Sequence, residues 1–248
     1  MVIVDKNTIS LIKKGVSLNK ISELTGLRKS TLYFHYQKIK GKKFLPLKFN
    51  FANRNDLGEF IGIFTGDGSF YKDKTYHYTI RIFVGYYERH YAEYLQKRFM
   101  KWFDKKPNIY LTYHNGKESM ITLSYYSKGL YELIKRYLDW KNKKTYTIKL
   151  KKLDLKDKKF NFGFLKGLID TDGNFYAPKR RLSFSTVSKD LADQVFLMIN
   201  HILGDQPNLN IIKKEYRSNL YTITLHGEKA RRLIRIIKPS NINKNTRQ

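Results

Sequence analysis

A twelve-residue stretch occurs twice in this chain, and it constrains the fold more than any other feature. The copies are Leu57–Gly68 and Phe162–Gly173. On a helix of 3.6 residues per turn, positions four apart lie on one face. Both copies place a small residue at every fourth position, namely Gly58, Gly62 and Gly66 in the first and Gly163, Gly167 and Thr171 in the second. The pattern predicts two buried helices whose backbones approach closely along these residues.

Signals for the helix ends flank both copies. Asp56 with Glu59 is expected to form a capping box at the start of the first helix, and Asn161 is expected to cap the second. Gly68 and Gly173 are expected to stop the two helices.

Each copy also carries an acidic residue just before its final glycine, Asp67 in the first and Asp172 in the second. If the helices pack in parallel, both carboxylates meet beside two partially negative helix C-termini, and a divalent cation would relieve the repulsion. One copy alone would indicate an ordinary core helix with a glycine stop, and the apolar runs are too short for a membrane span. Duplication of the acid at the same place favours a metal site.

The internal repeat extends beyond these two stretches. Asp67 and Asp172 are 105 residues apart, whereas later landmarks are 100 apart, which indicates a shorter first hairpin loop in the second copy. The landmarks are Pro107-Asn108 with Pro207-Asn208, Thr122 with Thr222, and Leu133-Ile134 with Leu233-Ile234. Turn residues and alternation predict helix, hairpin, helix, hairpin, helix in each copy. The predicted fold class is α+β: a duplicated αββαββα domain with antiparallel sheets, behind a small all-α module.

Alternation sorts the two faces of the predicted sheets. Ile80, Ile82, Val84, Leu182 and Phe184 are expected to face the helices. The opposite face then carries His77, Thr79, Arg81, Arg181, Ser183 and Ser185. Such a face is typical either of a solvated sheet or of a DNA-binding surface, and the pairing of two such sheets favours DNA.

Composition favours a polyanionic partner. The 248 residues include 49 Lys and Arg against 21 Asp and Glu, a net charge of +28, and that excess points to nucleic acid. A basic membrane-surface protein is the alternative, but no basic amphipathic helix dominates the chain, and no membrane partner is expected. The chain has no Cys, which excludes disulfides and thiolate metal sites. The start does not resemble a signal peptide, so we expect an intracellular protein, in the cytoplasm or nucleoid, or in an organelle of a eukaryote.

The N-terminal part reads as a separate module. Residues 7–40 predict three short helices with one apolar face each, and they resemble helix-turn-helix modules of resolvases and small regulators. The third helix of that motif enters the major groove, where its early residues would be Arg28, Lys29, Ser30, Tyr33 and His35. A structural three-helix cap is the alternative; ten Lys and Arg against two acids in residues 1–45 favour DNA. The predicted segments are 1–44 for this module, 45–55 for a basic linker, 56–155 for the first repeat and 156–248 for the second.

The duplicated stretches resemble the paired motifs of LAGLIDADG homing endonucleases. The residues that carry the resemblance are Phe60–Gly68 and Leu165–Gly173; the second is close to the family string, and the first has Thr65 where the name has its first Asp. The resemblance implies that Asp67 and Asp172 bind Mg²⁺, or Mn²⁺ as a substitute, with the carbonyls of Gly66 and Thr171 as helpers.

The same resemblance implies further features of the active protein. Tyr137–Lys144 matches the stretch where the family places a lysine near the scissile phosphate, which selects Lys141; the repeat places Asn241 opposite, so Lys244 would serve there or the two half-sites would differ. A saddle-shaped monomer would bind a long, imperfectly palindromic duplex and cut both strands, leaving 3′ overhangs. Because splice-junction residues are lacking at the chain ends, a free-standing, intron-encoded endonuclease is expected rather than an intein.

Two other functions fit parts of this pattern. An intron RNA maturase would use the same fold and basic surface to bind intron RNA, although two surviving acids favour cleavage. A non-catalytic DNA-binding transcription regulator would combine degenerate repeats with a helix-turn-helix, but loss of the acids would mark it, and both acids are present.

Overall fold

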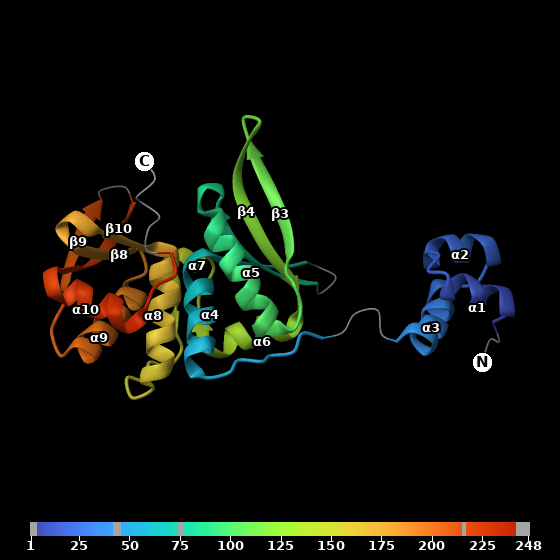
Figure 1. Cartoon of the computed structure of the whole chain (residues 1–248), viewed down its shortest axis with the longest axis horizontal. Coiled ribbons are helices and arrows are strands. Elements are labelled where there is room, and N and C mark those ends of the chain that lie inside the picture. The colour runs from blue at the N-terminus through green and yellow to red at the C-terminus, as the bar shows by residue number, and fades with distance from the viewer. Residues whose placement is uncertain (1–3, 42–45, 74–76, 215–216, 242–248) are drawn as a thin grey trace. The chain divides into compact units, whose positions relative to one another are not determined.

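The chain divides into two compact units, Met1–Pro46 and Leu47–Gln248. The computed structural model describes residues 4–41, 46–73, 77–214 and 217–241. Figure 1 shows the elements of both units.

The first unit consists of three helices, α1 (Lys6–Lys13), α2 (Leu18–Thr25) and α3 (Lys29–Lys40). Asp5 caps α1 by accepting a hydrogen bond from the Thr8 amide at 2.7 Å. Ile12, Ile21 and Leu32, one from each helix, are fully buried together. The helical pattern predicted for residues 7–40 is therefore present, with a small core of its own.

The first repeat of the second unit begins with the motif helix. Its elements are α4 (Arg54–Asp67), β1 (Gly68–Lys72), β2 (Tyr78–Gly85), η1 (Tyr86–Glu88), α5 (Arg89–Phe103), β3 (Asn108–His114), β4 (Lys117–Tyr126) and α6 (Lys128–Tyr137). A short connection follows, with β5 (Leu138–Asp139), α7 (Lys144–Thr147) and β6 (Lys149–Leu150).

The second repeat has the same order of elements. They are α8 (Lys158–Asp172), β7 (Gly173–Tyr176), η2 (Ala177–Lys179), β8 (Arg181–Thr186), α9 (Lys189–Leu203), β9 (Asn208–Lys214), β10 (Arg217–His226) and α10 (Gly227–Ile237). The helix–hairpin–helix–hairpin–helix order predicted for each copy is thus observed.

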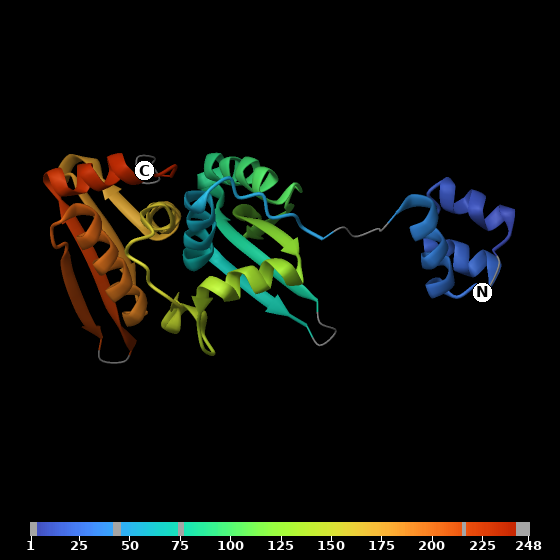
Figure 2. The same cartoon turned by 90° about the horizontal axis from the view of Figure 1, so that it is seen from below.

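Each repeat contains one four-stranded antiparallel sheet. The strand orders are β1-β2-β4-β3 and β7-β8-β10-β9, so the two sheets have equivalent topologies. Figures 1 and 2 show α4 and α8 side by side between the sheets. The five residues expected to face the helices, Ile80, Ile82, Val84, Leu182 and Phe184, are all buried.

The two motif helices pack backbone to backbone and in parallel. A Cβ built on Gly58 would collide with the Phe160 carbonyl oxygen, and one on Gly62 would collide with that of Phe164. The contact is reciprocal, because a Cβ on Gly167 would collide with the carbonyl oxygen of Glu59. The predicted close approach along the small residues is confirmed.

The predicted helix starts were wrong. Asn53 caps α4 by accepting from the Asp56 amide at 3.0 Å, and Asp157 caps α8 by accepting from the Phe160 amide at 3.1 Å. Both helices begin earlier than expected because each has a capping side chain further upstream. Asp56, Glu59 and Asn161 are instead buried inside the unit.

Within the described residues, no helix combines the length and apolar content that crossing a membrane requires.

Candidate metal site and nucleic-acid interface

The two motif helices end at the acidic residues that the sequence singles out, α4 at Asp67 and α8 at Asp172. Gly68 and Gly173 follow as C-caps with φ of −82° and −79°, which is ordinary extended backbone rather than the left-handed cap expected of a glycine stop. Glycine is required here for space, because a Cβ on Gly68 would collide with the Phe64 carbonyl oxygen. The chain can therefore pass directly from each motif helix into the first strand of its sheet.

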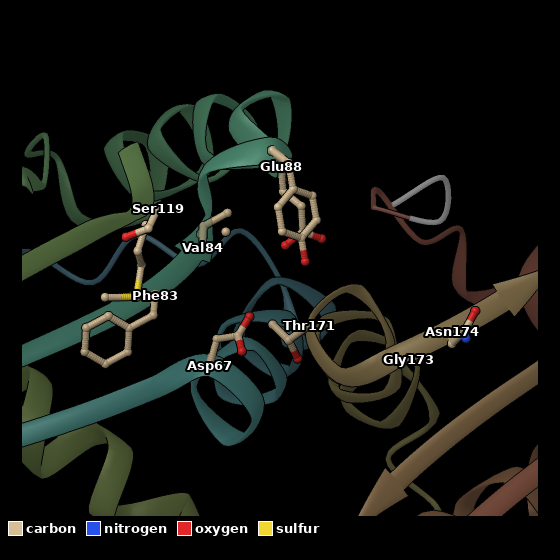
Figure 3. Close-up of a pocket in the computed structure, with 11 residues that line it drawn as sticks. Asp67, Phe83, Val84, Glu88, Ser119, Thr171, Gly173 and Asn174 are labelled. Atoms are coloured by element: carbon tan, nitrogen blue, oxygen red, sulfur yellow. The ribbon is translucent and has the colours of Figure 1, made fainter. Parts of the chain in front are cut away.

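The acidic ends of α4 and α8 lie against each other. A methyl group built on Gly66 would lie 2.9 Å from Oδ2 of Asp172 and would collide with Oγ1 of Thr171. The Thr171 hydroxyl donates back to its own helix, at 3.1 Å from the carbonyl oxygen of Gly167. Figure 3 shows Asp67 and Thr171 facing each other across the helix pair. The structure thus brings Gly66, Asp67, Thr171 and Asp172 together.

Lys144, at the start of α7, supplies a positive charge at this place. Its Nζ donates to the carbonyl oxygens of Phe64, Gly66 and Gly68, at 2.8, 3.1 and 2.5 Å. These carbonyls lie at the end of α4; that of Phe64 also accepts from the Gly68 amide, and the last carbonyls of a helix otherwise lack a partner within it. Burial lowers the pKa of Lys144 to about 8, and the negative charges of Asp172 and Asp67 oppose that shift. At neutral pH the ammonium group is therefore mostly charged and fully engaged by α4.

The structure places Lys144, and not Lys141, against the motif. Lys141 is exposed, and its backbone amide donates to Oγ1 of Thr147 at 2.9 Å. Lys244, the second lysine expected near a scissile phosphate, lies outside the described residues. The role of Lys141 near a scissile phosphate stays a prediction; within this stretch it is Lys144, the first residue of α7, whose side chain contacts α4. The sequence did contain an indication of Lys144, because Lys144 and Lys244 are 100 residues apart, like the other landmarks of the repeat.

Two cavities open on either side of Asp67. One, of about 420 Å³, lies toward the second repeat and is lined by Asp67, Phe83, Val84, Gly85, Tyr87, Glu88, Ser119, Met120, Thr171, Gly173 and Asn174 (Figure 3). The other, of about 400 Å³, lies toward α7 and is lined by Gly66, Asp67, Gly68, Ser69, Phe70, Phe83, Trp140, Asn142, Lys144 and Thr145. Both can admit a hydrated ion or a phosphate group next to the carboxylate.

The donor set suits a hard divalent cation. Among the described residues, no group of three or more His, Cys, Asp or Glu lies close enough to hold a metal. Protein oxygens would come from the carboxylates of Asp67 and Asp172, with the Thr171 carbonyl nearby; the Gly66 carbonyl already accepts from Lys144 at 3.1 Å. Mg²⁺ accepts such a set because it binds through one or two carboxylates and completes its shell with water and phosphate oxygens. The residues present therefore fit the expected metal.

A buried ionic network holds the middle of the helix pair. Lys166 of α8 donates to Oε1 of Glu59 on α4 and, at 2.7 Å, to the Tyr94 hydroxyl. Arg98 of α5 contacts Oε2 of Glu59 at 2.5 Å and Oδ1 of Asp56 at 2.8 Å. Burial disfavours the charged ammonium, but the carboxylates of Glu59 and Asp170 raise the pKa of Lys166 above its ordinary value. This network ties the two repeats together one helical turn or more behind the site.

A second network lies nearer the site and involves the end of the described chain. Oδ1 of Asp170 accepts from the amides of Ser240 and Asn241, at 2.6 and 2.8 Å. The Asn241 side chain donates to Glu88 of the first repeat at 2.7 Å. Burial raises the pKa of Asp170 to about 6, although Lys166 and the two amides favour its ionised form. Asn241, which the repeat aligned with Lys141, therefore has a structural contact between the repeats.

The outer faces of the sheets carry most of the expected interface residues. Arg81, Arg181 and Ser185 are exposed, and Ser183 is half-buried. His77 is exposed and forms an ion pair with Asp73 at 2.9 Å.

Thr79 lies on the outer face as expected but is only 6% exposed, which contradicts its expected role as a surface contact. Its direct cross-strand neighbours are Tyr71 on β1 and Tyr126 on β4. Cross-strand neighbours share a face, so the two rings cover the small threonine.

The outer face of the first sheet also carries exposed tyrosines, which were not predicted from the sequence. Tyr71, Tyr110 and Tyr126 are 56%, 49% and 62% exposed. The strand register places all three on the face of Arg81. Alternation along β3 and β4 could have identified them, because Leu123 and Ile121 mark the buried face of β4.

In the first unit, the residues proposed to enter a groove line the start of α3. Arg28, Lys29 and Ser30 are exposed, whereas Tyr33 and His35 are half-buried. Ser30 and Tyr33 also line a cavity of about 420 Å³ together with Ser17, Leu18, Asn19 and Lys29. DNA binding by this module stays a prediction.

Comparison with known proteins identifies the fold. Residues 159–238, within the second repeat, match the family model described as LAGLIDADG-like domain. No curated protein matches the chain. Among solved structures, variants of the homing endonuclease I-DmoI are 19% identical with a TM-score of 0.53, and the match covers 74% of this chain and 95% of I-DmoI.

Two further solved structures agree with that match. I-DmoI in complex with DNA and Ca is 19% identical with a TM-score of 0.53, covering 74% of this chain and 89% of the other. The homing endonuclease I-WcaI bound to its DNA recognition sequence is 16% identical with a TM-score of 0.54, covering 89% and 93%. The predicted α+β fold with antiparallel sheets is confirmed, and it is the fold of LAGLIDADG homing endonucleases.

Proposed function

We propose that a chain with the LAGLIDADG fold and two acid-terminated motif helices is a metal-dependent endonuclease that cuts both strands of duplex DNA. The observation that carries this proposal is the meeting of the Asp67 and Asp172 ends of α4 and α8, with Lys144 against the same carbonyls. Two carboxylates at the C-terminal ends of a helix pair are electrostatically unfavourable, because the helix dipoles are negative there. A purely structural role for the helix pair does not account for them.

Charge and fold support duplex DNA as the substrate. The net charge of +28 is far beyond what solubility requires. Solved structures of the same fold include I-DmoI in complex with DNA and Ca and I-WcaI bound to its DNA recognition sequence. We propose that this chain acts as a monomer, with each repeat covering one half of a long, imperfectly palindromic site, because the two repeats are related but not identical.

The residues of the site have separable roles in this proposal. Asp67 and Asp172, helped by the carbonyls of Gly66 and Thr171, would hold Mg²⁺ or Mn²⁺. When bound, a divalent ion activates water, neutralises charge on the phosphate and stabilises the leaving oxygen. Lys144 has three N–H donors and three carbonyl partners, so it acts by fixing the end of α4 and by placing a positive charge near the phosphate. We propose that the cuts are staggered to leave 3′ overhangs.

The decisive experiment removes one carboxylate at a time. A cleavable duplex is first selected from a randomised library with the native chain. Asp67→Asn and Asp172→Asn should each reduce cleavage on the order of a thousandfold, because several kcal/mol of metal-dependent stabilisation is lost. Asp205→Asn is the control, since Asp205 forms an exposed ion pair with Lys229 at 3.6 Å, away from the motif helices. Full activity of either site variant would remove Asp67 and Asp172 from the metal site.

Binding should survive those substitutions and should depend steeply on salt. Duplex affinity in the absence of cleavage should change less than about threefold in both site variants, since their shape is kept. The logarithm of the affinity should fall by about 0.9 per neutralised phosphate for each tenfold rise in salt. A flat salt response would argue against phosphate contacts along the two sheets.

A further inference from the structure

The outer faces of the two sheets differ in chemistry at equivalent positions. The strand register defines equivalence: Ser124 pairs with Arg81 and Asn108, as Thr224 pairs with Ser183 and Asn208. By that register the equivalent pairs are Phe83 with Ser185, Tyr110 with Asn210, and Tyr126 with His226. At each of these positions the first repeat has an aromatic ring, and the second has a smaller or more polar group.

On the first sheet, the tyrosine hydroxyls bond to one another. Oη of Tyr110 lies 3.2 Å from Oη of Tyr126. Ser124, which lies between them on the same face, is only 1% exposed. Phe83 lies further along β2 and pairs in register with Thr122, which is buried. The first sheet thus covers its small hydroxyl side chains and presents aromatic carbon, together with Arg81.

On the second sheet, small polar groups are accessible instead. Oγ of Ser185 lies 2.9 Å from Oγ1 of Thr222, where the first sheet has Phe83 and Thr122. Asn210 is exposed on the edge strand β9, where the first sheet has Tyr110; the neighbouring Asn208 is exposed as well, but so is its equivalent Asn108 on the first sheet. The exposed arginine, Arg181, occupies the position equivalent to Thr79 rather than that of Arg81. This face presents amides and hydroxyls that can donate and accept hydrogen bonds.

These two surfaces suit different features of the major groove. Thymine carries a C5-methyl group, which apolar and aromatic side chains contact, whereas adenine presents N7 and N6, which asparagine bonds in bidentate fashion. We infer that the first repeat reads its half-site mainly through thymine methyl groups, using Phe83 and the Tyr110–Tyr126 pair, and that the second reads purine edges through Asn210. The inference rests on the proposed function, and it makes the half-sites chemically unequal.

The test modifies one half-site at a time in a duplex that the native full-length chain binds and cuts. Replacing thymine by deoxyuracil removes only the methyl group and should weaken binding in one half alone, by about fourfold per contacted methyl. Replacing purines by 7-deazapurines removes N7 and should weaken binding in the other half alone, by about fivefold or more per lost bidentate contact. Equilibrium binding without divalent metal is the measurement.

Two variants assign each half to a repeat and serve as controls for one another. Phe83→Ser, which installs the residue of the equivalent position, should reduce the deoxyuracil effect by about fourfold, the share of one contacted methyl, and leave the 7-deazapurine effect unchanged. Asn210→Ala should do the reverse. Equal sensitivity of both halves, or a deoxyuracil effect that is undiminished in Phe83→Ser, overturns this inference and leaves the endonuclease proposal intact. If the native chain binds and cuts no duplex from the library, both fall together.

Discussion

The two motif helices can be compared residue by residue. Glycines of α4 lie against backbone carbonyls of α8, and glycines of α8 lie against backbone carbonyls of α4. Both helices carry an Asx side chain at the N-cap and a glycine at the C-cap. The two helices are therefore alike in backbone packing and in the type of residue at each end, although α8 begins one residue earlier relative to its final acid.

Their side chains are not equivalent. Glu59 of α4 corresponds to Phe164 of α8, and Lys166 of α8 corresponds to Ile61 of α4, by the spacing of 105 residues between Asp67 and Asp172. The ion pair between Glu59 and Lys166 therefore has no counterpart across the pseudo-symmetry axis. Close packing of the two backbones requires glycine in both helices. The other positions can differ, and side chains there make the two repeats different.

Filling the glycine stripe should have the largest effect. Gly62→Ala should lower the free energy of unfolding by more than about 4 kcal/mol, because the added Cβ meets the backbone of α8 and no flexible group can yield. Gly129→Ala is the matched control: its Cβ would lie 3.6 Å from the Phe49 ring, so stability should be unchanged or slightly higher. Thermal unfolding of both variants measures the difference. Equal melting temperatures would show that the helices can move apart at little cost.

Breaking the asymmetric ion pair should have a smaller effect. Glu59→Gln should destabilise the fold by about 3 kcal/mol, because Lys166 and Arg98 lose their shared buried partner. Lys166→Met should cost a similar amount, and the double variant less than the sum of the two. Denaturant unfolding of all four proteins gives the coupling energy, expected above about 1 kcal/mol. Simple additivity would mean that Glu59 and Lys166 act independently.

Substitution of Lys144 should reduce cleavage more than substitution of Lys141. Lys144→Met should reduce cleavage by at least about tenfold, since the α4 carbonyls lose their donor and the phosphate loses a nearby charge. Lys141→Met should change cleavage less than about threefold, because Lys141 is exposed. Single-turnover cleavage rates distinguish the two. A larger loss in the Lys141 variant would restore the lysine that the sequence favours.

Removal of the first unit should have the smallest effect on cutting. A chain starting at Leu47 keeps both motif helices, and it keeps Leu47 and Phe51, which are partly buried against the core, so it should fold and cut at the same position. With an effective concentration near 1 mM and a non-specific dissociation constant of about 10⁻⁴ M, loss of the tethered contact should weaken binding by about tenfold. The footprint should shrink on one side only. An unchanged footprint would assign residues 1–46 to another role.

Much of the architecture was predictable because it depends on backbone rules. The glycine stripe and the alternation of Ile80, Ile82 and Val84 each indicate one structure only, and that structure is observed. The predicted capping box was wrong because Asp56 and Glu59 can have two structural roles. Near the start of a helix they can cap it. Here they are buried and form ion pairs with Arg98, which lies 42 residues beyond Asp56 in the sequence.

The site was predictable as far as its local chemistry extends. Asp67 and Asp172 stand out because each lies at a helix end that the sequence itself marks. The sequence could not show that Lys144, rather than Lys141, contacts α4. That contact depends on the path of the short helix α7, which no helix-propensity rule predicts. Thr79 was misjudged because exposure on a sheet depends on the neighbours in adjacent strands, here Tyr71 and Tyr126.

The separation of α4 from α8 along the chain has a consequence for biosynthesis. A ribosome adds about 5–20 residues per second, so the 105 residues between Asp67 and Asp172 leave α4 without its partner for roughly 5 to 20 seconds. During that interval its bare stripe could pair with α4 of another nascent chain. Such a pair would set Glu59 of each copy against Ile61 of the other, with no lysine to neutralise it. The asymmetric ion pair therefore makes the pairing of α4 with α8 more favourable than the pairing of α4 with a second α4.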